Sequence, residues 1–303
     1  MTTDKKKTAK SATQKNHADQ DKGDPNDVGT TGHSWDGIKE LNNPLPRWWL
    51  WTFYATIVWA FAYMVVYPAI PLFKQATPGL FGYSSRQMLD DDLRHFEQAN
   101  APLDTALVAT PLADIKANPE LAHYATTGGA AVFKTFCAQC HGAGAAGASG
   151  YPNLLDDDWL WGGELEAIHL TIRHGIREEG DDDTRASEMP AFGELLERSD
   201  IDDVTHYVMS ISSGVYNPAL VNSGKTIFAD NCADCHGEMG KGNRELGAPN
   251  LTDRIWLYGA SQKDVAATIT HGRNGMMPAW QDRLTEAQIR QVAYYVHQLG
   301  GGE

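Results

Sequence analysis

One long apolar run stands out near the N-terminus. Residues 48–73 contain no charged side chain, and the densest part, residues 48–67, is 20 residues long. At about 1.5 Å per residue, a helix of that length spans roughly 30 Å, the thickness of the hydrocarbon core of a bilayer. Aromatic residues lie toward both ends, and Pro68 and Pro71 follow, as expected where a helix ends. The pattern predicts a transmembrane helix over residues 48–72, in preference to a buried globular helix.

Polar segments flank this run on both sides. Residues 1–34 hold almost no large apolar side chains, so they are expected to be a disordered tail, without a cleavable signal peptide. Residues 35–47 form a short pre-helix segment, and residues 73–125 are interpreted as a linker. Lysines and arginines are more numerous before the apolar run than directly after it. This predicts a cytoplasmic N-terminus and a periplasmic remainder.

The rest of the chain repeats itself. The pattern Cys-x-x-Cys-His at residues 137–141 recurs at residues 232–236, with a glycine and a phenylalanine at matching positions before each copy. The pattern Met-Pro-Ala-aromatic recurs as well, at residues 189–192 and 277–280. A repeat of this length predicts two small domains of similar fold. We place these domains at residues 126–214 and 220–303.

The two copies differ by one insertion. Matching residues lie 95 positions apart at the Cys-x-x-Cys-His motifs, 97 apart from Pro152 to His174, and 88 apart from Met189 onward. The drop from 97 to 88 shows that the first copy carries nine additional residues between His174 and Met189. The insertion is acidic and includes Asp181, Asp182 and Asp183.

The duplicated motif predicts covalent haem. Two cysteines separated by two residues can form thioethers with the vinyl groups at one edge of a porphyrin, and the histidine that follows can bind the iron. A zinc site built from two Cys-x-x-Cys pairs would leave both histidines unexplained, and a redox-active dithiol normally lies between a strand and a helix. Two covalently bound haem c groups are therefore expected. The residues are Cys137, Cys140, Cys232 and Cys235, with His141 and His236 as iron ligands.

A second axial ligand is expected from methionine. Met189 and Met277 occupy the same place in both repeats, and a thioether is a common sixth ligand in cytochromes c. Core filling is the alternative role for any methionine. The neighbouring Met276 has no repeated counterpart, because Glu188 stands at the equivalent position. Which methionine serves which haem stays open, because two domains packed face to face could exchange them.

Other repeated residues are assigned supporting roles. His174 and His271 are rival ligands, but a position beside the haem or its ligands is the preferred interpretation. Four aromatic residues are expected to pack against the porphyrin or fill the core: Trp159, Trp256, Tyr258 and Trp280.

Periodicity and composition complete the picture. Each copy begins and ends with apolar residues at helical spacing, and no alternating strand pattern is evident, so the fold class is all-α. The formal charge of −14 argues against nucleic acid as a partner. All 4 cysteines fall in the two motifs, which leaves none for a disulfide.

The whole pattern resembles the CcoP/FixP subunit of the cbb-type haem–copper cytochrome c oxidases. The resemblance covers residues 34–300 and is most specific before the apolar run, in Trp35-Asp36-Gly37-Ile38 and in residues 40–49. It implies one N-terminal transmembrane helix followed by two tandem cytochrome c domains.

Function and partners follow from this resemblance. It implies a dihaem electron-transfer subunit, inactive as an enzyme on its own, in the inner membrane of a bacterium. The implied partners are the catalytic haem–copper subunit that reduces O₂, a second c-type cytochrome subunit, a soluble or membrane cytochrome c donor, and membrane lipid. Two alternatives remain from the residues alone. These are a free-standing dihaem carrier and a dihaem peroxidase, which would need an open iron site.

Overall fold

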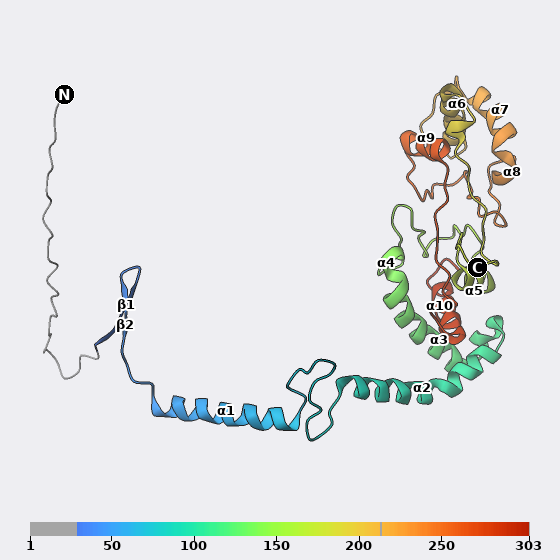
Figure 1. Cartoon of the computed structure of the whole chain (residues 1–303). Helices are drawn as coiled ribbons and strands as arrows, with labels where there is room; N and C mark the ends of the chain where they lie inside the picture. Colours follow the sequence, from blue (N-terminus) through green and yellow to red (C-terminus); the bar gives the residue numbers. More distant parts are fainter. Residues whose placement is uncertain (1–28, 213, 303) are drawn as a thin grey trace, which may run out of the picture. The chain divides into compact units, whose positions relative to one another are not determined.

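The computed structural model describes residues 29–212 and 214–302 (Figure 1). The described residues fall into two compact units, which are divided at residue 91. The helical class expected from the sequence is confirmed. The one sheet among the described residues is a two-stranded hairpin, and the other elements are helices.

The hairpin occupies part of the expected tail. Strand β1 (Thr30–Trp35) pairs antiparallel with strand β2 (Ile38–Leu41), and Asp36 and Gly37 form the turn with φ values of 50° and 86°. An Asp-Gly pair favours such a turn because both positions need positive φ. Every residue of both strands is exposed. Because neither face of the hairpin is buried, its sequence lacks the alternation of apolar and polar residues by which a strand is predicted.

The expectation of a disordered tail over residues 1–34 is therefore wrong for residues 30–34, which lie in β1. Residues 1–28 lie outside the described residues. The expected pre-helix segment, residues 35–47, contains the rest of the hairpin and runs on to the start of α1.

Helix α1 (Arg47–Val66) has 20 residues and is the one described helix long and apolar enough to cross a membrane. Thr52 and Thr56 donate their hydroxyls to backbone carbonyls of the preceding turn at 2.9 Å and 2.7 Å, which satisfies these hydroxyls within the helix. The helix ends at Val66 and not at residue 72 as expected. Pro68 is the cause, because the residue before a proline disfavours helical geometry.

The chain after α1 folds back onto its end. The backbone N–H groups of Leu80 and Phe81 donate to the carbonyls of Val65 and Val66 at 3.0 Å and 3.2 Å. These are carbonyls that the last turn of a helix otherwise leaves unpaired.

The expected linker over residues 73–125 is largely helical. It contains α2 (Ser85–Ala109), the 3₁₀ helix η1 (Leu112–Ala117) and the start of α3 (Pro119–Val132). Leu107, Ile115 and Leu121 from this stretch are buried in the core of the second unit. The linker interpretation is therefore wrong from about residue 103 onward, because these apolar residues complete a core whose other members lie far away in sequence.

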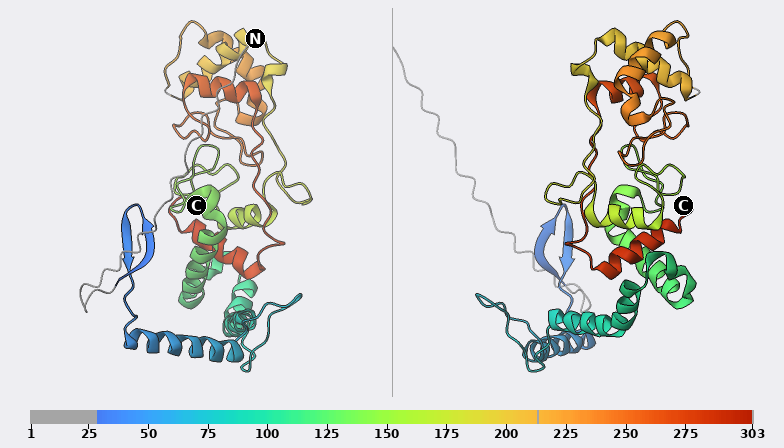
Figure 2. Two further views of the ribbon diagram at one scale, coloured as in Figure 1. Left: turned by 60° about the vertical axis from the view of Figure 1, so that its left-hand side comes forward. Right: turned by 90° about the vertical axis from the view of Figure 1, so that its right-hand side faces the viewer.

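The second unit contains two helical lobes, each with its own core (Figure 2). Lobe 1 comprises residues 103–175 and 277–299, and lobe 2 comprises residues 189–272. Lobe 1 is built from α3, the π-helical turn η2 (Phe133–Cys137), α4 (Ala138–His141), α5 (Leu165–His174) and α10 (Glu286–His297). Lobe 2 is built from η3 (Phe192–Glu194), α6 (Arg198–Ile211), α7 (Val221–Asn231), α8 (Ala233–His236) and α9 (Gln262–His271).

Each lobe combines helices from both sequence repeats. Helix α10 of the second repeat packs along α3 of the first, and α6 of the first repeat packs along α7 of the second (Figure 1). The repeated glycines mark both crossings. A Cβ at Gly129 would lie 2.1 Å from the carbonyl oxygen of Gln291, and a Cβ at Gly224 would lie 2.1 Å from that of Asp203.

The expected domain boundaries, residues 126–214 and 220–303, therefore describe the sequence repeats but not the lobes. Lobe 2 is continuous in sequence, yet it starts with the methionine segment and ends before its own repeat does. Lobe 1 is interrupted by lobe 2. The sequence repeat could not reveal this exchange of helices. Equivalent helices have similar contact surfaces, so they could pack within one repeat or between the two repeats.

Candidate functional site

Both Cys-x-x-Cys-His motifs fold into a short helical turn. Cys137 and Cys140 belong to such a turn in lobe 1, and Cys232 and Cys235 belong to one in lobe 2. In each pair the first cysteine is half-buried and the second is exposed, and all four are free thiols. Cysteines three positions apart lie on the same face of a helix, so both sulfurs of a pair can meet one edge of a porphyrin.

The first thiol of each pair is not activated as a nucleophile. Burial, followed by the charge of the neighbouring cysteine, raises the pKa of Cys137 and of Cys232 to about 11. A redox-active dithiol needs the opposite shift, because the thiolate is the reactive form. The environment therefore disfavours the dithiol alternative.

The histidine of each motif is held by a backbone carbonyl. Nδ1 of His141 lies 3.0 Å from the carbonyl oxygen of Pro152, and Nδ1 of His236 lies 3.1 Å from that of Pro249. Burial lowers the pKa of both imidazoles, and the hydrogen bond only partly opposes it. A neutral imidazole that donates from Nδ1 presents the lone pair of Nε2 to a metal. The two prolines are equivalent in the repeat, since each begins a Pro-Asn-Leu sequence, at residues 152–154 and 249–251.

The two methionines lie in the lobes opposite to their repeats. Met277 and Cys137 both pack against the core of lobe 1, and Met189 and Cys232 both pack against the core of lobe 2. The backbone of Met277 exchanges two hydrogen bonds with Ile176, at 2.9 Å and 3.0 Å.

Met189 exchanges the equivalent pair of hydrogen bonds with Arg273, both at 2.9 Å. Ile176 directly follows the end of α5, and Arg273 directly follows the end of α9. Each methionine segment is thus fixed to the lobe that carries the other repeat's motif.

Two glycines permit this close approach. Gly175 and Gly272 end α5 and α9 with a φ of 68° each, a conformation that costs L-residues energy. A Cβ at Gly175 would lie 2.4 Å from the carbonyl oxygen of Met277, and a Cβ at Gly272 would lie 2.3 Å from that of Met189.

The rival histidines have unequal surroundings. Nδ1 of His174 lies 3.0 Å from Oδ2 of Asp181, whereas His271 is exposed. His174 is therefore engaged by a carboxylate of the insertion.

The other methionines differ from Met189 and Met277. Met209 is buried in the core of lobe 2, while Met239 and Met276 are exposed by 74% and 64%. The core-filling role fits Met209, and the exposure of Met276 matches its lack of a repeated counterpart.

The aromatic residues singled out in the sequence divide between the lobes. Trp159 and Trp280 pack against the core of lobe 1, together with Met277, and Trp256 packs against that of lobe 2. Tyr258 instead lies beneath a guanidinium group, that of Arg273.

Two arginines that the sequence analysis did not single out share one arrangement. Arg185 lies 5.3 Å over the ring of Trp161 and donates to the hydroxyl of Thr171. Arg273 lies 4.1 Å over the ring of Tyr258 and donates to the hydroxyl of Thr268 at 2.6 Å. All three pairs are repeat-equivalent: Arg185 with Arg273, Trp161 with Tyr258, and Thr171 with Thr268. The 88-residue offset of Arg185 and Arg273 was the signal that could have found them.

These arginines fit an anionic group. Burial lowers the pKa of Arg185, and Nε of Arg273 is buried without a hydrogen-bond partner. No carboxylate of the described residues forms an ion pair with either guanidinium. A buried cation normally requires a counter-charge, and the propionate carboxylates of a haem have the appropriate chemistry.

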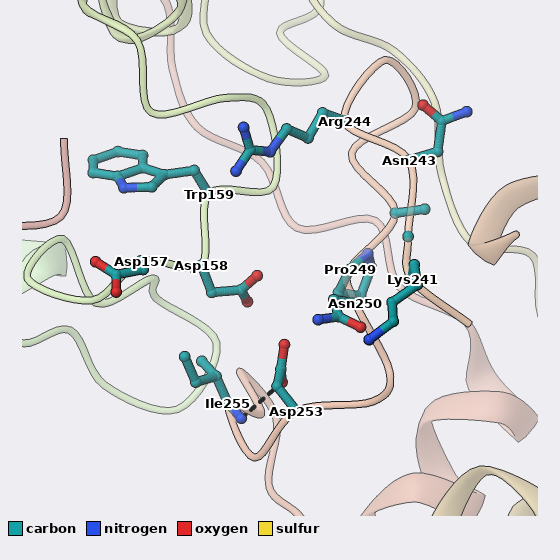
Figure 3. A pocket seen from close by; sticks show the side chains of 12 residues that line it. Asp157, Asp158, Trp159, Lys241, Asn243, Arg244, Pro249, Asn250, Asp253 and Ile255 are labelled. Carbon is teal, nitrogen blue, oxygen red and sulfur yellow. Dashed lines mark hydrogen bonds between the residues drawn. The ribbon is translucent and has the colours of Figure 1, made fainter. Parts of the chain in front are cut away.

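A cavity of about 530 Å³ opens between the lobes (Figure 3). Residues 157–159 of lobe 1 and residues 241–255 of lobe 2 line it. Burial, then the charges of Asp253 and Asp156, raise the pKa of Asp158 to about 6, although Arg244 opposes the shift. Asp158 is therefore protonated over part of the acidic pH range.

Comparisons with known proteins cover most of the chain. The family model described as the N-terminal domain of cytochrome oxidase-cbb3, FixP, matches residues 27–74. The model for cytochrome c matches residues 127–212, and that for cytochrome C oxidase, cbb3-type, subunit III matches residues 219–296.

Curated relatives are similar over nearly their full length. The chain is 59% identical over 281 residues to the cbb3-type cytochrome c oxidase subunit CcoP of Cereibacter sphaeroides, covering 92% of this chain and 97% of that protein. It is 51% identical over 276 residues to the subunit FixP of Sinorhizobium medicae, covering 91% of this chain and 96% of that protein.

Proposed function

Because the chain belongs to the CcoP/FixP family of cbb3-type cytochrome c oxidase subunits, we propose that it carries two haem c groups whose methionine ligands are exchanged between the sequence repeats. The chain is a cytochrome c subunit that transfers electrons within an oxidase complex, as the resemblance implied. Family membership decides against the free-standing carrier and the dihaem peroxidase.

Cys137 and Cys140 would hold the haem of lobe 1 through thioethers, and His141 and Met277 would be its iron ligands. Cys232 and Cys235 would hold the haem of lobe 2 in the same way, with His236 and Met189 as its iron ligands. The observation that supports this exchange is the backbone pairing of Met277 with Ile176, next to the helix that closes lobe 1.

The haem supplies one-electron chemistry when bound, and the protein residues orient it and limit access to it. Two protein ligands on each iron leave no position for a substrate, which suits electron transfer. The carbonyls of Pro152 and Pro249 keep the imidazoles in the required tautomer. Arg185 and Arg273 would hold the propionates.

The proposed location is the inner membrane of a bacterium, with α1 as a single span. Arg47, the first residue of α1, and Lys39 before it support a cytoplasmic N-terminus, with both lobes in the periplasm. The proposed partners are the catalytic haem–copper subunit, a second c-type cytochrome subunit and a cytochrome c donor. Protease added to intact spheroplasts should cleave the haem lobes, whereas lobes protected until lysis would contradict this topology.

The ligand exchange can be tested by labelling one haem. Cys140→Ala leaves the lobe 1 haem with a single thioether, which shifts its absorption band and distinguishes it from the other haem. Met277→His in this background should lower the reduction potential of the labelled haem by on the order of 100 mV, within the ~0.8 V range that axial ligands span. Redox titration of the purified complex, followed at both bands, measures this.

Met276→His provides a matched control at the exposed neighbouring position. It should leave both potentials unchanged. A shift confined to the unlabelled haem after Met277→His would instead show that each methionine serves its own repeat.

A further inference from the structure

The acidic insertion of the first repeat is a closed loop on lobe 1. The backbone N–H of Arg177 donates to the carbonyl of Arg185 at 2.8 Å, and the N–H of Glu178 donates to the hydroxyl of Thr184 at 3.1 Å. These bonds join the two ends of the loop. They also bring the guanidinium of Arg185 to Thr171, a contact that matches the one between Arg273 and Thr268 in lobe 2.

Asp181 is the buried centre of this loop. Its side chain is 5% exposed, and both carboxylate oxygens are engaged. Nδ1 of His174 lies 3.1 Å from Oδ1 and 3.0 Å from Oδ2, and the backbone N–H of Asp183 donates to Oδ1 at 2.9 Å. The side-chain amide of Gln281 donates to Oδ2 at 2.7 Å.

These contacts join the two sides of the methionine segment of lobe 1. His174 is the last residue of α5, and Gln281 lies four positions after Met277. A second contact reinforces the first, because the backbone N–H of Ala279 donates to Oε2 of Glu178 at 3.4 Å. The insertion therefore holds the segment that contains Met277 against the helix that precedes it.

Lobe 2 lacks this arrangement. The residue equivalent to Gln281 is Gly193, which has no side chain to donate a hydrogen bond. The equivalent of His174 is His271, which is exposed and forms no hydrogen bond or ion pair with the described residues. The insertion itself has no counterpart in the second repeat.

We propose that Asp181 is a positioning residue that latches the Met277 segment onto lobe 1, so that Met277 leaves its iron less often than Met189 leaves the other iron. This rests on the proposed function, since Met277 must be the ligand of the lobe 1 haem. Movement of the Met277 segment away from lobe 1 would break hydrogen bonds to the buried carboxylate of Asp181. This movement costs free energy, because water would have to replace the lost donors.

The latch is tested by the rate at which cyanide binds to ferric haem, which depends on how often the methionine dissociates. The measurement uses full-length holoprotein carrying Met189→His. In this protein two histidines bind the lobe 2 iron, and only the iron served by Met277 opens readily. Asp181→Ala should raise the cyanide-binding rate roughly tenfold, as loss of a charged hydrogen bond predicts.

Gln281→Ala should raise the rate as well. The double variant should add little to either single change, because both residues belong to one contact.

Asp182→Ala is the matched control, since it removes the same charge from an exposed position of the same loop. It should leave the rate unchanged. An equal increase with Asp182→Ala, or no increase with Asp181→Ala, would overturn the latch.

Failure of the proposed function would look different. If Met277 were not a ligand, the Met189→His protein would lack the far-red charge-transfer band of methionine-ligated ferric haem before Asp181 is changed. If Met277 served the lobe 2 haem instead, cyanide would shift the absorption band of the unlabelled haem when Cys140→Ala labels the haem of lobe 1.

Discussion

The candidate axial histidines are oriented by carbonyl groups and not by carboxylates. The partners are Pro152 for His141 and Pro249 for His236. A carboxylate partner would raise the basicity of the imidazole and its electron donation to iron, whereas a carbonyl fixes the tautomer with little added charge. A neutral imidazole and a neutral methionine thioether as iron ligands would favour the reduced state. This suits a subunit that delivers electrons toward an oxygen-reducing site.

The half-buried Arg185 and Arg273 should influence the potential of a haem whose propionates they would hold. Arg273→Gln removes a positive charge from lobe 2. Loss of this charge stabilises the ferric form of the lobe 2 haem, so the reduction potential of that haem should fall. A change of about 1 kcal/mol corresponds to roughly 40 mV for a one-electron couple. Redox titration measures it. Arg254→Gln, an exposed change of equal charge in the same lobe, should have a much smaller effect, and equal shifts would contradict a propionate contact.

Asp158 should make stability depend on pH. Burial raises its pKa to about 6, so the native state retains a proton that the unfolded chain releases near its ordinary pKa of about 4. The free energy of unfolding should therefore decrease as pH rises from about 4 to about 6 and remain lower above that.

Asp158→Asn should remove this component and raise the melting temperature at neutral pH. Thermal unfolding of the full-length holoprotein followed by circular dichroism between pH 4 and pH 8 provides the measurement. Asp157→Asn, at an exposed position of the same segment, should melt like the wild type. Identical pH profiles for wild type and Asp158→Asn would contradict the assignment.

At the scale of elements, the sequence identified the parts of the site but not their pairing. Motif chemistry and repeat position predict the four cysteines, His141 and His236 as haem-binding residues, and they single out Met189 and Met277 as ligand candidates. The lobe in which each methionine lies depends on the pairing of residues 176–189 with residues 273–277, and this pairing connects the two repeats. Helices α6 and α10 are equivalent in the repeat, so the contact of Phe133 with Tyr295 could equally have been made with Tyr207.

The glycine at the end of α9 should control the methionine of lobe 2. Gly272→Ala places a Cβ 2.3 Å from the carbonyl of Met189 and forces an L-residue to a φ of 68°, which alone costs about 1–2 kcal/mol. We expect lower stability and a weakened charge-transfer band from the lobe 2 haem.

Absorption spectra of the ferric protein together with thermal unfolding measure both effects. Gly144→Ala is the control, because a Cβ there meets nothing within 4 Å. A Gly272→Ala protein with wild-type spectrum and stability would show that Met189 does not depend on this approach.

At the scale of the whole chain, one lobe interrupts the other. Lobe 2 is inserted between α5 and the Met277 segment of lobe 1, so the last residues of the chain complete the lobe that contains the first motif. The same arrangement explains why the linker expected over residues 73–125 was wrong. Its apolar residues are covered partly by α10, which lies more than 150 residues later in the sequence. Local patterns cannot report a core whose halves are so far apart.

Because of this arrangement, removing the C-terminal residues should affect the haem of the first motif, although the second motif is closer to the C-terminus in sequence. A chain that ends at Met276 lacks Met277 and α10, which together close lobe 1. The haem at Cys137 and Cys140 should then lose its sixth ligand and bind carbon monoxide rapidly when reduced. The haem at Cys232 and Cys235 keeps Met189 and should remain closed.

Carbon monoxide difference spectra, with Cys140→Ala again labelling the lobe 1 haem, distinguish the two sites. The lobe 2 haem of the same molecule is the internal control, since α6 and α7 remain packed together there. If the truncated chain opened the haem of the second motif and left the labelled one closed, each repeat would form its own domain. The exchange of segments would then be wrong.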